Sequence, residues 1–425
     1  MKIHIRNGRV IDPASGADAK QDIFIGASKI VALGAAPPGY SANRVIDAAG
    51  LVVCPGLVDL AVRLREPGLE YMATLESEMD AAVAGGVTSL ACPPDTDPPL
   101  DEPGLVEMLK FRAKNLNQAR VYPVGALTVG LKGERLTEMG ELVDAGCVAF
   151  SHADAPLTDT QLLLHALQYA ATFDFAVWLR PQDAWLARGG VAHDGQVATR
   201  LGLPAIPACA ETVALETILL LARETGARVH LCRLSSAAGV EMVRAARQSG
   251  FNVSCDVAVH HAHLSEMDIG YFDPNCRLTP PLRGLRDRDA LRAALADGTA
   301  AALCSDHAPV DDDAKQLPFD ETEAGATGVE LLLPLALKWS EESKLPLAQG
   351  LARITCDPAR ILGIDAGRIA VGADADLCIF DPQRYWKVGP ATLKSQGKNT
   401  PFTGLEIRGK VRYTLVDGQL VYESK

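Results

Sequence analysis

Polar side chains that could do chemistry stand directly after apolar runs of this chain. Residues 55–68 read PGLVDLAVRLREPG and carry Arg63, and Arg180, Arg233 and Asp306 follow similar runs. A carboxylate in such a place can bind a metal or move a proton. An arginine has five N–H donors and no lone pair to give a metal. Three arginines meeting in one cavity would repel a divalent cation.

Eight short apolar runs would position these side chains, and each is followed by a stretch able to form a helix or a long loop. The runs cover residues 57–63, 87–92, 120–126, 146–151, 175–180, 228–234, 252–259 and 300–305. Near-continuous apolar strands that alternate with helices predict an α/β fold of the (β/α)8 TIM-barrel type. Chemistry in such a barrel sits at the carboxyl ends of the strands. The chain has no G-x-G-x-x-G or Walker-type loop for a nucleotide.

The residues after 228–234 carry a clear helix pattern. Ser236 can cap it, Val240, Val243 and Ala246 share one face, and a glycine follows at position 250.

The two ends of the chain both alternate apolar and polar residues. Their turn signals are Asn7-Gly8, Ala49-Gly50, Gly372, Gly409 and Asp417-Gly418. Each end alone is too short to bury much surface. We therefore expect residues 1–50 and 366–425 to form one small composite β domain, and residues 51–365 to form the barrel.

Composition narrows the class of protein. The 425 residues are 48% hydrophobic and 22% charged, with a formal net charge of −12. This balance argues against nucleic-acid binding, which needs clustered basic residues. We expect a cytoplasmic protein without a signal peptide or a membrane span. The ten cysteines include no C-x-x-C pair and are predicted to be buried, reduced residues.

Three strings point to a family. They are Leu64-Arg65-Glu66-Pro67-Gly68, Thr279-Pro280-Pro281-Leu282-Arg283 and Ser305-Asp306-His307-Ala308-Pro309. Together with the ending GKNTPFTGLEIRGKVRYTLVDGQLVYE, they make the whole chain resemble the dihydroorotases of the amidohydrolase superfamily. The resemblance implies an amidohydrolase-type barrel and, in active members, a zinc-bound hydroxide that opens or closes a cyclic amide.

The metal ligands of that family are not kept. The changed positions are Ala61 and Arg63 for the two histidines of the first strand, His152 for an aspartate, and Arg180 and Arg233 for two further histidines. Of six expected ligands only Asp306, the general base of the family, survives. Bound metal lowers the pKa of water to about 7. A carboxylate of pKa near 4 cannot activate bulk water by itself, so we expect no metal and a vestigial Asp306.

The substrate pocket that the resemblance implies is also altered. Arg65 is kept, but the family's asparagine is Asp95 and a substrate-binding histidine is Val310. A carboxylate at position 95 would repel an anionic substrate. We therefore expect Arg65 to be a vestigial substrate-binding residue.

Other polar groups have structural interpretations that we favour. His260, His261 and His263 are expected to pack and hydrogen-bond at a strand end. His152 and His307 could make a three-ligand site with Asp306, which the nearby arginines disfavour. The acidic run at positions 311–313 is expected to be a solvated loop, with a contact to a basic partner as the alternative.

The leading hypothesis is a catalytically inactive dihydroorotase homologue in pyrimidine biosynthesis. Dihydroorotase-like chains without metal ligands associate with aspartate carbamoyltransferase in some bacteria. The resemblance thus implies that the catalytic chains of that enzyme are the partner, and we also expect a homo-oligomer. One alternative is an active zinc-dependent dihydroorotase, or a related cyclic amidohydrolase, with a rearranged metal site. Another is a metal-free binding module for a pyrimidine intermediate.

The loss of the metals carries a structural prediction. A carboxylate buried without a partner costs several kcal/mol, or about 3–5 kcal/mol when its partner is removed. We therefore expect Asp306 to pair with at least one of Arg63, Arg180 and Arg233, in a mouth filled by side chains. Asp59 and Asp183 are further carboxylates that could need such a partner.

Overall fold

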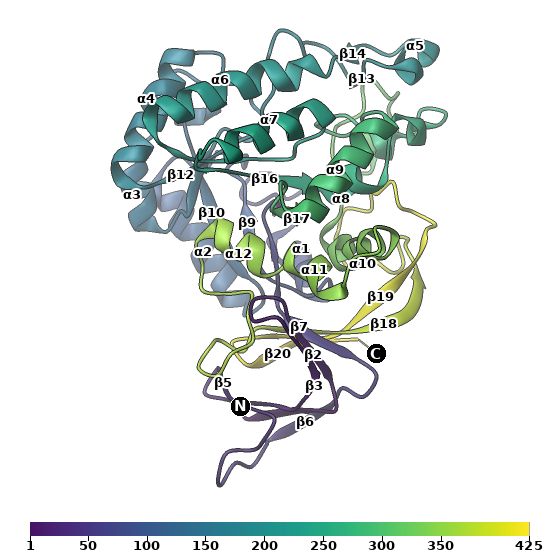
Figure 1. The fold of residues 1–425 in the computed structure, drawn as a ribbon. Helices are drawn as coiled ribbons and strands as arrows, with labels where there is room; N and C mark the ends of the chain where they lie inside the picture. The colour runs from purple at the N-terminus through teal and green to yellow at the C-terminus, as the bar shows by residue number, and fades with distance from the viewer. Residues whose placement is uncertain (425) are drawn as a thin grey trace.

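The computed structural model describes residues 1–424, and its centre is a barrel of parallel strands (Figure 1). The barrel strands are β8 (Leu57–Asp59), β9 (Val87–Cys92), β10 (Arg120–Ala126), β11 (Ala149–Ser151), β12 (Ala176–Leu179), β15 (Arg228–Leu231), β16 (Val253–Ala258) and β17 (Ala302–Cys304). They pair in the order β17-β16-β15-β12-β11-β10-β9-β8. Each of the eight predicted runs contains one of these strands, so the predicted TIM-type fold is confirmed.

The barrel closes just beyond its two edge strands, β8 and β17. The backbone N–H of Arg63 donates to the carbonyl of His307 at 2.9 Å, and the N–H of His307 donates to the carbonyl of Ala61 at 2.9 Å. This bridge fixes the residues after β8 beside those after β17. It therefore places the mouth positions 61, 63 and 306 next to one another.

Helices cover the outside of the barrel (Figure 1). Eight of them are α1 (Leu75–Ala84), α2 (Pro103–Leu116), α3 (Met139–Ala145), α4 (Thr160–Phe173), α6 (Cys209–Thr225), α7 (Ala237–Gln248), α9 (Leu285–Asp297) and α10 (Leu332–Glu342). The others are α5 (Gln196–Leu201), α8 (Val259–His263), α11 (Leu347–Ala352) and α12 (Cys356–Leu362), and a short sheet pairs β13 (Ala192–His193) with β14 (Ala205–Ile206). Apolar side chains of strands and helices form one core between the two layers. No helix in residues 1–424 is long and apolar enough to cross a membrane.

Helix α7 follows its sequence pattern. The hydroxyl of Ser236 accepts a hydrogen bond from the N–H of Gly239 at 3.0 Å, which caps the helix. Val240, Val243 and Ala246 are buried on one face. Gly250 follows the helix with a positive φ of 82°, a conformation that glycine adopts without a steric penalty.

Strands from both ends of the chain build two further sheets on one side of the barrel. They are β1 (Ile3–Arg6), β2 (Arg9–Asp12), β3 (Ala17–Lys20), β4 (Ile23–Gly26), β5 (Lys29–Leu33), β6 (Arg44–Asp47), β7 (Val52–Pro55), β18 (Leu377–Lys387), β19 (Glu406–Val416) and β20 (Gln419–Glu423). The orders are β5-β4-β1-β6 and β20-β19-β18-β7-β2-β3. The second sheet joins the two ends through β7 and β18. The division into units at 1–50 plus 366–425 and 51–365 stays a prediction.

One expected turn is wrong. Gly409 lies inside β19 with a φ of 94°, opposite a bulge of β18 between Asp381 and Tyr385. A Cβ there would lie 2.5 Å from the side chain of Leu337. Glycine at position 409 therefore serves a positive φ and a close approach to α10, and not a chain reversal. The Asp417-Gly418 turn is confirmed between β19 and β20.

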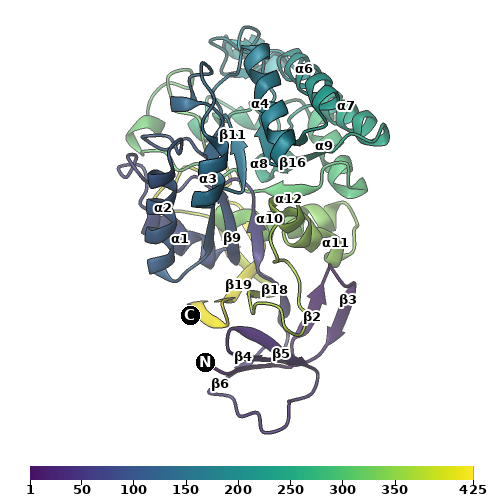
Figure 2. The ribbon, with the colours of Figure 1, turned by 90° about the vertical axis from the view of Figure 1, so that its left-hand side faces the viewer.

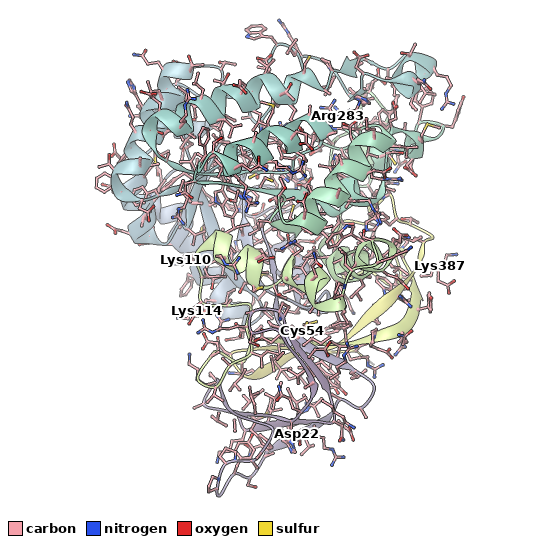
Figure 3. All side chains as sticks on the ribbon, viewed as in Figure 1. Asp22, Cys54, Lys110, Lys114, Arg283 and Lys387 are labelled. Atoms are coloured by element: carbon pink, nitrogen blue, oxygen red, sulfur yellow. The ribbon has the colours of Figure 1, made fainter. Side chains whose placement is uncertain are left out.

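The junction between barrel and terminal sheets is packed and ion-paired. Cys54, labelled in Figure 3, is fully buried on β7 opposite Cys378 of β18. Arg120, at the start of β10, pairs with Asp376 and Asp417. The described cysteines form no disulfide, and most of them are buried, as the sequence predicted.

Candidate functional site

The altered ligand positions meet at the barrel mouth. Arg63 follows β8, Arg180 follows β12, Arg233 follows β15, and Asp306 follows β17. Their side chains are almost entirely buried. The structure thus brings together the three arginines that the sequence singled out.

Asp306 is paired with two of the three arginines. Its Oδ1 accepts hydrogen bonds from Nη1 of Arg233 at 2.9 Å and from Nη1 of Arg63 at 3.3 Å. Burial alone would raise the pKa of the Asp306 carboxyl, but Arg233 and Arg63 lower it below its ordinary value. The predicted pairing is confirmed, and Asp306 is a charged structural group.

The centre of the network is Asp154, whose carboxylate contacts all three arginines. Nη2 of Arg233 and Nε of Arg180 donate to Oδ1 at 2.6 Å each, and Nη2 of Arg63 donates to Oδ2 at 2.7 Å. Arg180 also donates to the backbone carbonyl of Asp154 at 3.0 Å. Against the effect of burial, these cations hold the pKa of Asp154 far below its usual range. One third of the side chain, 33%, remains exposed.

A third carboxylate balances the charge. Nε of Arg63 donates to Oδ2 of Asp95 at 2.7 Å. Burial opposes the cationic form of Arg63, but Asp95 and Asp154 raise its pKa above the ordinary arginine value. Three guanidinium groups and three carboxylates therefore form one neutral network across the mouth.

Little space remains beneath this network. A cavity of about 30 Å³ is lined by the three arginines and by barrel residues that include Trp178, Cys232 and Asp256. A drug-sized ligand site typically measures about 300–1,000 Å³. The cavity has room for a water molecule or two and not for a pyrimidine ring. The mouth is filled by side chains, as predicted.

His152 is held in hydrogen bonds of its own. Its Nε2 lies 2.8 Å from Oγ1 of Thr128, and its Nδ1 lies 2.9 Å from the carbonyl of Ala155. Burial lowers the pKa of His152. His307 is likewise engaged, with Nε2 2.6 Å from the buried Glu78 and Nδ1 accepting from the N–H groups of Gly328 and Val329. These two histidines do not form a three-ligand site with Asp306.

The other two strand-end aspartates lie outside the network. Oδ1 of Asp59 accepts from the N–H groups of Ser305 and Ala61, Oδ2 has no partner within residues 1–424, and burial raises the pKa of Asp59 to about 6. Asp183 is more exposed and accepts from the N–H groups of Trp185 and Leu186.

The residues at the family's metal positions do not fit zinc. Ala61 and the three arginines offer no ligand atom. The nitrogens of His152 and the carboxylate of Asp306 are engaged with Thr128, Ala155 and the arginines. We therefore derive no step through a metal at these positions.

Another group of possible donors lies deeper in the barrel. Within residues 1–424, only His230, Cys232 and Asp256 bring three ligand atoms within 4.8 Å of one another. The nitrogens of His230 lie 2.9 Å from Oγ of Ser254 and 3.1 Å from Oδ2 of Asp256. The other oxygen of Asp256 accepts from the backbone N–H of Arg233 at 2.5 Å. His230 and Asp256 are therefore a buried, hydrogen-bonded polar pair.

Arg65, the expected vestigial substrate residue, lies beside the network without joining it. Its Nε donates to the carbonyl of Pro309 at 2.9 Å, and burial lowers its pKa. Arg283, labelled in Figure 3, donates to the carbonyl of Ile206 at 2.7 Å and to Oγ of Ser235 at 3.2 Å. Both arginines of the family-like strings therefore bond to the protein itself.

The histidine cluster after β16 is packed, as expected, but the expected hydrogen bonding holds for His261 and His263 and not for His260, whose ring nitrogens have no partner within residues 1–424. His260 stacks on Phe402, while Nε2 of His261 and of His263 lie 3.0 and 2.9 Å from the carbonyls of Pro280 and Leu335. Burial lowers the pKa of His260 and of His263 to about 4, so both are neutral at pH 7. Their role is structural.

Two essential members of the network were not identified from the sequence. Asp154 stood unremarked after the altered position 152, and Asp95 was interpreted as repelling a substrate instead of pairing with Arg63. The charge balance of the site could have indicated that more carboxylates were needed. Three buried arginines need about as many carboxylates, and Asp306 alone cannot supply them.

Comparison with known proteins agrees with the sequence motifs. The Dihydro-orotase-like family profile matches residues 50–238, and the Amidohydrolase family profile matches residues 191–422. A Dihydroorotase-like protein of Pseudomonas aeruginosa is 49% identical over 423 residues, covering 100% of each chain. The chain belongs to the dihydroorotase-like amidohydrolases. Another relative, a Dihydroorotase of Geobacter sp. strain M21, is 41% identical, also with 100% of both chains covered.

Solved structures show the same fold over the full length of this dihydroorotase-like chain. L-hydantoinase (dihydropyrimidinase) from Arthrobacter aurescens superimposes with a TM-score of 0.87 at 25% identity, covering 99% of this chain and 96% of the other. Dihydropyrimidinase from Brevibacillus agri gives a TM-score of 0.84 at 22% identity, covering 100% and 95%. The second likeness concerns the fold alone.

Proposed function

We propose that this chain is a catalytically inactive dihydroorotase homologue that acts as a structural partner of the catalytic chains of aspartate carbamoyltransferase in pyrimidine biosynthesis. The arginine–carboxylate network is the observation that supports the proposed loss of activity. Arg63, Arg180 and Arg233 stand at former ligand positions and bind Asp154 at 2.6–2.7 Å. A hydroxide at neutral pH needs a metal or a base of suitable pKa, and neither is available at this mouth.

The carboxylate that could act as a base is poorly suited to the task. The pKa of Asp306 is lowered by two guanidinium groups, which makes it a weaker base than an ordinary aspartate. Its Oδ1 is engaged by both arginines. The cavity of about 30 Å³ that the three arginines line is too small for the ring of a cyclic amide.

The role in assembly rests on what the chain keeps. A barrel, a pair of terminal sheets and a neutral, filled mouth form a rigid body whose surface can serve a partner without chemistry of its own. The resemblance to metal-deficient dihydroorotase-like chains suggests the partner. The net charge of −12 favours a partner surface with basic patches and an association rate that falls with salt.

Co-expression with the carbamoyltransferase catalytic chain tests the assembly role. Light scattering should detect a complex at micromolar concentrations, and carbamoyltransferase activity should rise when this chain is present. Arg233→Lys keeps a charge at the network and is a useful control, since assembly should survive it. Absence of a complex at low salt, with unchanged carbamoyltransferase activity, would refute this role.

The second candidate is an active dihydroorotase with a rearranged metal site. It is favoured by the relatives named Dihydroorotase at 39–41% identity. Within residues 1–424, its metal would have to use His230, Cys232 and Asp256. Chelator-sensitive turnover of dihydroorotate that is lost in Cys232→Ser would establish it and would overturn the inactive assignment.

A further inference from the structure

Helix α6 presents an unpartnered face to solvent. It runs along the outside of the barrel, at the end of the molecule away from the terminal sheets (Figures 1 and 2). Leu220 is 50% exposed and Val213 is 46% exposed on this helix. Glu216 and Arg223 are also exposed, and neither forms an ion pair within the part of the chain that the structure describes.

The spacing of these residues sets their positions around Leu220. Successive residues of an α-helix are separated by about 100° and about 1.5 Å. Glu216 therefore lies about 40° to one side of Leu220 and about 6 Å toward the start of the helix. Arg223 lies about 60° to the same side and about 4.5 Å toward its end. Thr217 and Glu224 occupy the opposite flank.

We propose that α6 is the centre of a two-fold symmetric interface with a second copy of this chain. In an antiparallel pair with the axis beside Leu220, each flank of one helix faces the same flank of the other. Glu216 of each copy then lies level with Arg223 of the second copy, within about 1.5 Å along the helix. The two leucines meet between two opposite-charge pairs.

The self-complementary charges favour a second copy over an unrelated protein. Under a two-fold axis, Glu216 of each copy faces Arg223 of the other, so one pattern on a single surface forms two opposite-charge pairs. A different partner would need a matching pattern of its own. The unpaired state of Glu216 and Arg223 within the chain is accounted for by the same contact.

Neighbouring exposed aromatic residues extend the contact, because one helix face falls short of the roughly 800 Å² per partner of a stable interface. Trp185 is 71% exposed and lines a surface cavity of about 120 Å³ together with Val213 and Thr217. The cavity also includes the first turns of α4, so α4 is on the Thr217 flank. Phe173, exposed at the far end of α4, comes toward Trp185 of the second copy in the antiparallel arrangement.

Sedimentation and light scattering of the full chain at several micromolar concentrations test the interface. The parent should be dimeric. Glu216→Arg and Arg223→Glu should each raise the dimer dissociation constant at least about tenfold by facing like charges. The double charge swap should restore the dimer, because it recreates both pairs in reverse. Leu220→Lys should give a monomer.

Glu107→Arg on the exposed face of α2 is the matched control, and it should leave the dimer unchanged. Melting temperatures of all variants should stay near that of the parent, which separates loss of association from loss of fold. A parent that is monomeric throughout, a dimer indifferent to Glu216→Arg or Leu220→Lys, or a double swap that stays monomeric would each overturn the proposal.

Discussion

Replacing Arg233 by alanine tests whether the arginines hold the barrel mouth together. The change leaves Asp306, which is 7% exposed, with only the 3.3 Å contact to Arg63. Asp154 keeps Arg63 and Arg180 and a third of its side chain in solvent. Asp306 therefore dominates the cost.

The size of the loss follows from the partners that remain. Removing one member of a buried ion pair costs about 3–5 kcal/mol. Because Arg63 still touches Asp306, we expect Arg233→Ala to lower the free energy of unfolding by about 3 kcal/mol. Arg180→Ala should cost only about 1–2 kcal/mol, since Asp154 retains two arginines and water.

Urea unfolding followed by circular dichroism measures these losses. Arg200→Ala on the exposed face of α5 is the control and should stay within about 0.5 kcal/mol of the parent. The pair Arg233→Met and Asp306→Asn should recover most of the loss in the double variant, because no buried charge is left alone. If Arg233→Ala unfolds at the same urea concentration as the parent, the network does not stabilise the fold and the reasoning is wrong.

Four further outcomes can be checked. Elemental analysis should find no stoichiometric zinc at the mouth, and no turnover of dihydroorotate should be measured. Calorimetric titration with dihydroorotate should give no heat of binding, since Arg65 already bonds to the protein; saturable heat that Arg65→Ala abolishes would favour the binding-module alternative. The pKa of Asp59 is raised to about 6, so its neutral form contributes stability that is present below about pH 4 and lost as pH rises through 6. Asp59→Asn should therefore stabilise the protein by up to about 3 kcal/mol at pH 8, as measured by urea titration. The pKa values of His260 and His263 are lowered to about 4, so their neutral forms contribute stability that is complete above about pH 6.5 and lost as pH falls toward 4. His260→Phe should reduce that loss, as measured by thermal melts at acid pH.

The barrel could be predicted because its strands are fully buried, and fully buried strands are written as continuous apolar runs. The same was true of α7, whose cap, apolar face and terminating glycine all stand in the local sequence. Gly409 was misread because a glycine of positive φ can stand in a turn or inside a strand. Only the packing of β19 against Leu337 separates the two.

The network could be predicted only in part, since the three arginines and Asp306 were identified from the sequence and Asp154 and Asp95 were not. The three arginines were visible because each stands where the family has a metal ligand. Their main partner, Asp154, is 91 residues from Arg63 and 79 from Arg233 along the chain. No local pattern fixes where the loop after β11 turns, and Ala153 adopts a positive φ of 49° there. The approach of Asp154 to three strand ends is a property of the closed barrel.

The network also explains why a zinc site at these positions is not one substitution away. Changing Arg63 to histidine would remove one cation from Asp95, Asp154 and Asp306 together. It would supply one ligand to a place where two other guanidinium groups still repel zinc. Removing Asp154 first would leave three buried arginines facing two carboxylates. Each single step toward metal binding therefore unbalances buried charge, and zinc binding at this mouth would require several coordinated replacements.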